Sequence, residues 1–266
     1  MVLKCRERAD ALKAAIQKHH YNQELGSFGS QTANSVALKQ ALVTGRESER
    51  VRNALLADVD RHQGRFTGGS MEGVRHIFNT LSAVSPERAY QAITLPGFPG
   101  YRHMMEIEPG SGTVWEMWDG STRRPDSACG HRCIQVSTPL HALVYLYGDL
   151  AGIHPDPAQP GLRHVILRPA IPDSLESFGA AIETPYGRLS TKWQHAASKL
   201  DWQVTVPPNS SATLELPAWL NPRHDVREAG KTLGGDPDVS ILPAADGSFR
   251  IGLRAGTYHF TALKNP

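Results

Sequence analysis

The segment Leu200-Asp-Trp-Gln-Val-Thr-Val206 alternates apolar and polar side chains along its whole length. This period of two is typical of a β-strand that buries one of its faces. Similar short runs fill the chain after residue 155, and turn signals such as Pro185-Tyr-Gly187 and Pro207-Pro-Asn209 separate them. Several short strands at this spacing predict an antiparallel β-sandwich over residues 154–266.

The chain before the predicted sandwich repeats its apolar side chains at helical spacing instead. Three stripes show this period: Ala9, Leu12 and Ile16; Val51, Leu55 and Val59; and Met71, Val74, Phe78 and Leu81. We predict helices over residues 3–19, 31–44, 47–63, 70–83, 86–94 and 138–151. The connections between most of them are short, so antiparallel hairpins of an α-toroid are expected over residues 1–153. Residues 96–137 lack the period and are expected to be irregular.

Composition excludes several classes of protein. The 266 residues are 40% hydrophobic and 20% charged, and 28 Lys and Arg residues against 26 Asp and Glu give a formal net charge of +2. This balance is typical of a folded globular protein, and it lacks the strongly basic face that nucleic-acid binding requires. No run approaches the roughly 20 apolar residues of a membrane span. Neither a nucleic acid nor a membrane is therefore expected as a partner.

The cysteines indicate a reducing compartment. Cys5, Cys129 and Cys133 are too few for a disulfide framework. The first residues also lack the pattern of a secretory signal, so a cytoplasmic location is expected. Cys129 and Cys133 flank His131, but zinc needs about four ligands and only the distant Cys5 is left to supply another thiolate. We therefore expect no metal site.

The segment Trp115-Glu-Met-Trp-Asp119, inside the irregular region, suggests chemistry. Indole rings offer flat apolar surfaces to the C–H faces of a sugar, and a carboxylate handles hydroxyls or a water molecule. Aromatic surroundings also tend to shift the pKa of a carboxyl group, which suits proton transfer at Glu116. The alternative is structural: Trp115 and Trp118 anchor a core, and Glu116 lies beside them on the surface.

Thr113-Val-Trp-Glu-Met-Trp-Asp-Gly120 resembles the Thr-x-Trp-Glu-x-Trp-Asp segment of bacterial-type α-L-rhamnosidases. Other segments resemble that family in the same order along the chain: Ser30-Gln-Thr-Ala33, Gly64-Arg-Phe-Thr-Gly68, Leu150-Ala-Gly-Ile153, Pro160-Gly-Leu-Arg-His164, Thr184-Pro-Tyr-Gly-Arg188 and Val206-Pro-Pro-Asn-Ser-Ser-Ala212. The resemblance implies part of a six-hairpin (α/α)6 barrel followed by a C-terminal β-sandwich. It also implies inverting hydrolysis of terminal α-L-rhamnosyl bonds in a rhamnose-containing glycoside, without a metal or other cofactor.

The resemblance also implies roles for particular residues. Glu116 is expected to be the general base that activates water. Trp115, Trp118 and Asp119 are expected to line the sugar site. His131 is the candidate for a histidine that contacts the sugar, although the residues around it differ from the family pattern.

The first half of the family's barrel, which carries the general acid, has no counterpart in this sequence. Glu106, Glu108, Asp119 and Asp126 are candidate substitutes, and no sequence feature selects one of them. Six hairpins need twice the six predicted helices, so apolar helix faces are expected to lack partners. We expect a partial chain with little activity alone, completed by a complementary half-barrel chain or by self-association. The alternatives are an inactive sugar-binding or interaction module and a different (α/α)6 glycosidase.

Overall fold

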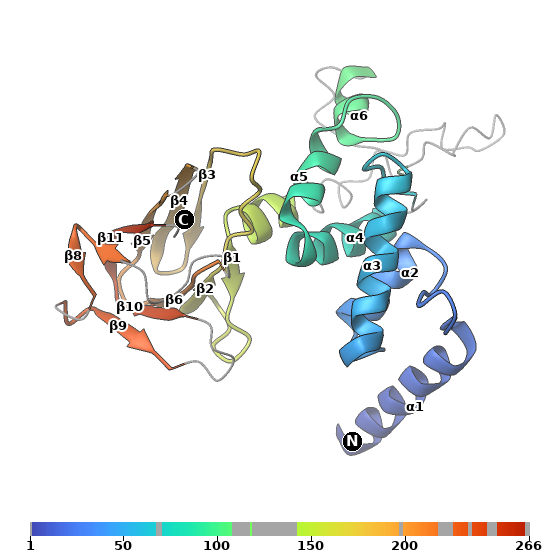
Figure 1. The fold of residues 1–266 in the computed structure, drawn as a ribbon. Helices are drawn as coiled ribbons and strands as arrows, with labels where there is room; N and C mark the ends of the chain where they lie inside the picture. The colour runs from blue at the N-terminus through green and yellow to red at the C-terminus, as the bar shows by residue number, and fades with distance from the viewer. Residues whose placement is uncertain are drawn as a thin grey trace, which may run out of the picture. The chain divides into compact units, whose positions relative to one another are not determined.

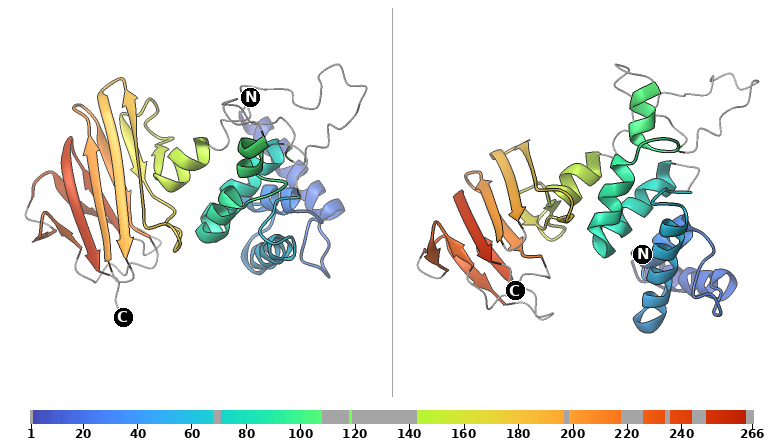
Figure 2. Two further views of the ribbon diagram at one scale, coloured as in Figure 1. Left: turned by 90° about the horizontal axis from the view of Figure 1, so that it is seen from above. Right: turned by 45° about the horizontal axis from the view of Figure 1, so that its top comes forward.

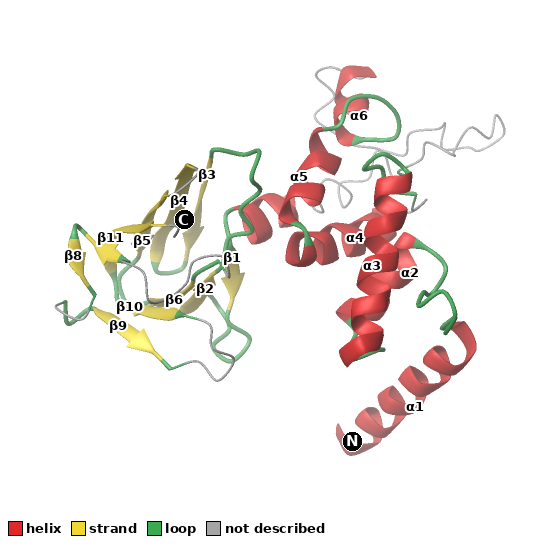
Figure 3. Ribbon diagram, viewed as in Figure 1, coloured by secondary structure: helices red, strands yellow, loops and turns green. Residues whose placement is uncertain are grey.

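A computed structural model describes residues 2–67, 71–107, 118, 143–196, 199–217, 226–233, 236–243 and 249–263. The chain divides into two compact units, Met1–Ala142 and Leu143–Pro266 (Figure 1). The first unit is helical and the second is built mainly from strands, as the two sequence patterns predict (Figure 3). The division follows residue 142, whereas the sequence pattern placed the boundary after residue 153.

The described helices of the first unit are α1 (Val2–His20), α2 (Gln31–Lys39), α3 (Gly45–Arg61), α4 (Met71–Val84), α5 (Pro86–Thr94) and α6 (Tyr101–Ile107). Local signals set several of these bounds. Ser30 accepts a hydrogen bond from the backbone N–H of Ala33 and begins α2, and Pro86 occupies the first turn of α5. Helix α2 ends earlier than predicted, at Lys39, and Ala41 then adopts a φ of 48°, a left-handed conformation that does not continue a helix.

Helix α6 lies in the region that was expected to be irregular, so that prediction is wrong for residues 101–107. Seven residues make about two helical turns, which is too short for a hydrophobic period to show in the sequence. The rest of the predicted irregular region, apart from residues 96–100 and 118, lies outside the described residues.

Helix α2 packs against α3 and α4, and α4 also packs against α5. The predicted stripes of α3 and α4 are buried in these contacts: Val51, Leu55, Val59, Val74, Phe78 and Leu81. The stripe of α1 is different, since Leu12 is 56% exposed and Ile16 is 38% exposed. The described helices form no closed barrel, and they leave the apolar stripe of α1 uncovered.

The second unit begins with a helical segment, η1 (Tyr145–Leu150), and continues with eleven described strands. These are β1 (Ile153–Pro155), β2 (His164–Leu167), β3 (Ser177–Thr184), β4 (Gly187–Ala196), β5 (Lys199–Val206), β6 (Ser211–Glu215), β7 (Arg227–Glu228), β8 (Lys231–Thr232), β9 (Val239–Leu242), β10 (Arg250–Leu253) and β11 (Gly256–Leu263). They form a five-stranded sheet in the order β1-β2-β6-β10-β9 and a six-stranded sheet in the order β3-β4-β5-β11-β7-β8 (Figure 2).

The two sheets enclose one hydrophobic core, so the unit is a β-sandwich. Leu189, Trp193 and Trp202 of the six-stranded sheet are buried with Leu214 and Ile251 of the five-stranded sheet. Every described strand pairing is antiparallel except that of β2 with β6, which is parallel. The parallel pair forms because β3, β4 and β5 belong to the other sheet, and the chain then returns to the first sheet in its original direction.

Close contacts join η1 to the sandwich. The indole N–H of Trp193 donates to the carbonyl of Leu150 at 2.6 Å, and the backbone N–H of Ala170 donates to the carbonyl of Asp149 at 2.8 Å. Gly152, with a φ of 77°, allows this approach, because a Cβ there would lie 2.3 Å from the nitrogen of Pro169. The described part of the helix predicted over residues 138–151, which is residues 143–150, therefore belongs to the second unit.

Candidate functional site

Of the five residues that the sequence assigns to a sugar site, the structure describes Trp118. Trp115, Glu116, Asp119 and His131 lie outside the described residues. Trp118 is 1% exposed, and its indole N–H donates to the backbone carbonyl of Phe66 at 3.1 Å. This is the position that the core-anchor alternative predicts for Trp118, and the contact of Trp118 with a sugar stays a prediction.

Trp118 belongs to an aromatic cluster of the helical unit, which we define as Phe66, Phe78, Tyr101 and Trp118. The ring centroid of Trp118 lies 5.0 Å from that of Tyr101 and 5.9 Å from that of Phe66. The ring centroids of Phe66 and Phe78 are 4.7 Å apart. Phe78 comes from α4, Tyr101 from α6, and Phe66 from the segment after α3. Four distant parts of the chain therefore meet in one aromatic cluster, in which the indole of Trp118 contacts Phe66 and Tyr101.

The hydroxyl of Tyr101 differs from the indole N–H of Trp118, which has a hydrogen-bond acceptor. Tyr101 is 3% exposed, and its hydroxyl has no hydrogen-bond partner among the residues that the structure describes. Burial raises the pKa of this phenol above its usual value, because the charged form loses its contact with water. The side chain therefore stays neutral and serves the cluster as an apolar ring.

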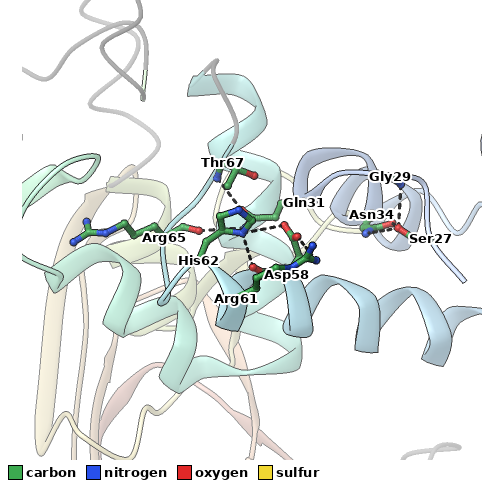
Figure 4. A network of polar contacts seen from close by, with 9 residues as sticks. All are labelled: Ser27, Gly29, Gln31, Asn34, Asp58, Arg61, His62, Arg65 and Thr67. Atoms are coloured by element: carbon green, nitrogen blue, oxygen red, sulfur yellow. Dashed lines mark hydrogen bonds and ion pairs between the residues drawn. The ribbon is translucent and has the colours of Figure 1, made fainter. Parts of the chain in front are cut away.

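A buried amide connects α2 to the same region (Figure 4). Gln31 is fully buried, its side-chain amide donates to the carbonyl of Arg65 at 3.2 Å, and its side-chain oxygen accepts from the backbone N–H of Thr67 at 3.0 Å. Residues 65–67 are thus held on both sides of Phe66, whose carbonyl receives the indole N–H of Trp118. Sequence reasoning placed Gln31 in a resembling segment but gave it no role, and its polarity at a buried helix start was the available signal.

Arg65 holds the segment that leads into α6. Its guanidinium donates to the carbonyls of Pro96, Gly97 and Pro99 at 2.8, 3.2 and 3.2 Å. A guanidinium presents its donors in a rigid planar fork, so it can bind several carbonyls of one turn at once. The 65–67 segment therefore organises both the approach to α6 and the contact with Trp118.

The described residues bring together no acid–base pair that would serve hydrolysis. Glu106, one of the candidate acids, lies on α6 and pairs with Arg102 at 2.8 Å on the surface. Glu108, Asp119 and Asp126 lie outside the described residues. Among the residues that the structure describes, no group of three His, Cys, Asp or Glu side chains is placed to hold a metal ion, and no helix is long and apolar enough to cross a membrane.

Two family models match the chain. The model of the bacterial alpha-L-rhamnosidase 6 hairpin glycosidase domain matches residues 3–139. The model of the bacterial alpha-L-rhamnosidase C-terminal domain matches residues 152–230. These ranges correspond to the helical unit and to most of the strand unit, in the order that the sequence predicts.

Known proteins resemble the chain over most of its length. An alpha-L-rhamnosidase of Formosa agariphila is 23% identical over 239 residues, which are 88% of this chain and 25% of that protein. The structure of the alpha-L-rhamnosidase from Dictyoglumus thermophilum matches with a TM-score of 0.78 and 25% identity, over 97% of this chain and 28% of that one. The Streptomyces avermitilis alpha-L-rhamnosidase, solved in complex with L-rhamnose, matches with a TM-score of 0.69 and 23% identity, over 94% of this chain and 23% of that one.

These comparisons confirm the expected fold class, a partial helical-hairpin toroid followed by a β-sandwich. The chain spans about a quarter of the length of the relatives it matches.

Proposed function

Because the chain belongs to the bacterial α-L-rhamnosidase family, we propose that it serves the hydrolysis of terminal α-L-rhamnosyl bonds in rhamnose-containing glycosides. The observation that carries this proposal is the match of the six-hairpin glycosidase domain to residues 3–139, which include Trp115-Glu-Met-Trp-Asp119. Hydrolysis of this kind needs a base for the attacking water and an acid for the leaving oxygen.

In this proposal Glu116 is the general base of an inverting reaction. The acid would then lie across the sugar at a carboxyl separation of about 6.5–9.5 Å, which leaves room for the water. Trp115 and Asp119 would line the sugar, and His131 would contact it. Trp118 supports the proposal in a different way: its buried indole donates to the carbonyl of Phe66 and anchors the chain at residue 118, and we propose that this anchor helps to position Glu116.

The general acid is proposed to come from outside this sequence. The exposed apolar stripe of α1 supports this part, because Leu12 and Ile16 need a partner surface that the described helices do not provide. A complementary half-barrel chain would cover the stripe and supply both the missing helices and the acid, whereas self-association of this chain would cover the stripe alone. Little activity is then expected from the chain alone, because an inverting reaction that lacks its acid loses most of its rate.

The second candidate function is an inactive module that binds sugar or another protein. The exposed apolar stripe of α1, with Leu12 and Ile16 open to a partner surface, favours it. For either function we propose a reducing, cytoplasmic location, which three cysteines and the free thiol of Cys5 support.

Hydrolysis of p-nitrophenyl α-L-rhamnoside by the purified chain tests the first candidate. We expect slow release of p-nitrophenol that Glu116→Gln abolishes and Glu106→Gln leaves unchanged, since Glu106 is a surface residue paired with Arg102. The same release by the Glu116→Gln variant would refute the role of Glu116. No release, together with calorimetric binding of L-rhamnose, would favour the binding module.

Self-association is tested separately by sedimentation of the chain and of its Leu12→Glu variant. The proposal expects association that the charged variant weakens. A monomer whose activity on the rhamnoside equals that of a complete rhamnosidase would refute the need for a partner.

A further inference from the structure

The outer face of the six-stranded sheet carries a groove that the proposed hydrolysis does not use. It has a volume of about 740 Å³, within the range of small-ligand sites. Strands β3, β4, β5 and β11, which lie side by side in Figure 1, form its floor together with residues at β7. Every residue that lines it belongs to the second unit.

The strand register explains why this face is hollow. Gly179 of β3 pairs with Lys192 of β4, and Ala181 pairs with Ser190. Alternate residues of a strand share a face, so Gly179 and Ala181 put almost no side chain on this face of β3. The longer side chains of β4 therefore stand beside an empty strip, and the groove results.

The floor of the groove consists of hydrogen-bonding side chains in two rows across the strands. One row pairs Lys192 with Gln203 and then with His259, and the neighbouring row contains only hydroxyls, from Ser190, Thr205 and Thr257. Tyr258 is the only aromatic residue among the described lining residues, and it is 5% exposed. Protein interfaces rely on aromatic and apolar anchors, so this surface suits a ligand held by hydrogen bonds and charge better than a folded protein partner.

The other sheet shows what a self-satisfied polar face looks like in this protein. On its outer face Glu215 pairs with Arg168 at 3.0 Å and with Arg250 at 3.1 Å. The ring nitrogens of His164 lie 2.7 Å from the hydroxyl of Ser211 and 3.0 Å from that of Thr213. These side chains use their polar atoms on one another.

The groove leaves its polar atoms available. Within the described parts of the chain, the side chains of Ser190, Lys192 and Gln203 make no hydrogen bond or ion pair with protein. His259 lies 3.6 Å from Asp201 at one end of the row. Among the described residues, a hydroxyl, an ammonium and an amide at the centre of the groove therefore remain available to hydrogen-bond a ligand.

The charges of the lining indicate the sign of the ligand. Arg188 and Lys192 stand on the same face of β4, about 13 Å apart along the strand. Arg188 has a loose contact of 3.8 Å with Glu183, and both of these side chains are mostly exposed. Glu228 is the one acidic residue among the described lining residues. An anionic group would therefore meet Lys192 without having to displace a carboxylate from it.

From the groove, its uncommitted donors and its charge, we propose that the outer face of the six-stranded sheet binds an acidic oligosaccharide. A sugar carboxylate accepts from the ammonium of Lys192, and neighbouring sugar hydroxyls bind Ser190 and Gln203. This site is separate from Glu116, and its existence does not depend on whether the chain hydrolyses rhamnosides.

The test is calorimetric titration of the full chain with three ligands of similar length: tetragalacturonate, the neutral maltotetraose and the acidic peptide tetraglutamate. We expect tetragalacturonate to bind at least about tenfold more tightly than either of the others, the ratio that one charge-assisted hydrogen bond supplies. Equal binding of maltotetraose would refute the role of charge, and equal binding of tetraglutamate would refute the sugar specificity. No binding of tetragalacturonate would overturn the proposal.

Two variants locate the binding. Lys192→Glu is expected to weaken tetragalacturonate binding by about tenfold or more, and Lys231→Glu, the same charge change at an exposed position on β8, by less than about twofold. Ala181→Leu fills the hollow without changing the charge and is expected to weaken binding as well. Circular dichroism of each variant verifies folding. Equal weakening by Lys192→Glu and Lys231→Glu, or full affinity in Ala181→Leu, would overturn the assignment of the groove.

Discussion

Replacing Trp118 by Phe distinguishes an indole that anchors the core from one that faces a ligand. The change removes the N–H that donates to the carbonyl of Phe66 at 3.1 Å, and Phe66 is 1% exposed. A buried carbonyl that loses its donor costs about 1–3 kcal/mol. The smaller ring also leaves space beside Tyr101, so we expect a loss of about 2–4 kcal/mol in the free energy of unfolding of the helical unit.

Tyr101→Phe is the matched control in the same cluster. It also removes a polar group from a buried aromatic ring, but within the described part of the chain the hydroxyl of Tyr101 has no hydrogen-bond partner. Deleting an unsatisfied buried hydroxyl costs nothing in hydrogen bonding, so this variant is expected to lie within about 0.5 kcal/mol of the unsubstituted chain or to be more stable.

Urea unfolding followed by far-ultraviolet circular dichroism measures both variants, because the helical signal comes mainly from the first unit. The two units are fitted as separate transitions. If Tyr101→Phe costs as much as Trp118→Phe, the hydrogen bond to Phe66 is not the reason for the loss. If Trp118→Phe keeps full stability but abolishes rhamnose binding, the indole faces the ligand and the core-anchor interpretation is refuted.

Three further predictions concern other contacts. In the sandwich, Thr191→Val leaves the buried indole N–H of Trp202 without its acceptor at 2.8 Å. Unfolding monitored by fluorescence should therefore show a loss of about 1–3 kcal/mol in the free energy of unfolding. The control Thr205→Val, on the groove face, should change this free energy by less than about 0.5 kcal/mol. Gly152→Ala should lower the free energy of unfolding by more than about 4 kcal/mol, because its Cβ meets the backbone of Pro169. Gly161→Ala, also at positive φ but in open space, should lower it by about 1–2 kcal/mol. Equal losses of the two variants in thermal unfolding would contradict the clash. The bidentate hydrogen bonds from Arg88 lower the pKa of Asp60. The pair therefore stabilises the folded chain above about pH 4, and this contribution is lost as the pH falls through the folded-state pKa. Asp60→Asn should lower the free energy of unfolding by up to about 1 kcal/mol at neutral pH, and its urea midpoint should converge with that of the unsubstituted chain at low pH.

Much of the fold is present in the periodicity of the sequence. The stripe Val51, Leu55 and Val59 repeats at the helical period and is buried on α3. Leu200, Trp202, Val204 and Val206 alternate with polar residues, and all four are buried on β5. These predictions succeed because an apolar face is a local property, which the spacing of residues along one element is enough to specify.

Periodicity identifies an apolar face without identifying what covers it. The α1 stripe of Ala9, Leu12 and Ile16 shows this, because it has the same spacing as the buried stripes but remains exposed. Helix α6 shows the opposite limit, since it is too short to display a period. The parallel pairing of β2 with β6 depends on which sheet the intervening strands join, which no local pattern encodes.

The sequence alone determined that two units of different periodicity follow one another, that the chain resembles one family of glycosidases, and that Trp115-Glu-Met-Trp-Asp119 is the segment to test for chemistry. Only the tertiary structure decided that Trp118 packs against Phe66 and Tyr101, and that Gly179 and Ala181 open a groove beside Lys192. The physical reason is the same in both cases. Burial and concavity arise from side chains that are distant in the sequence and meet only when the chain is folded.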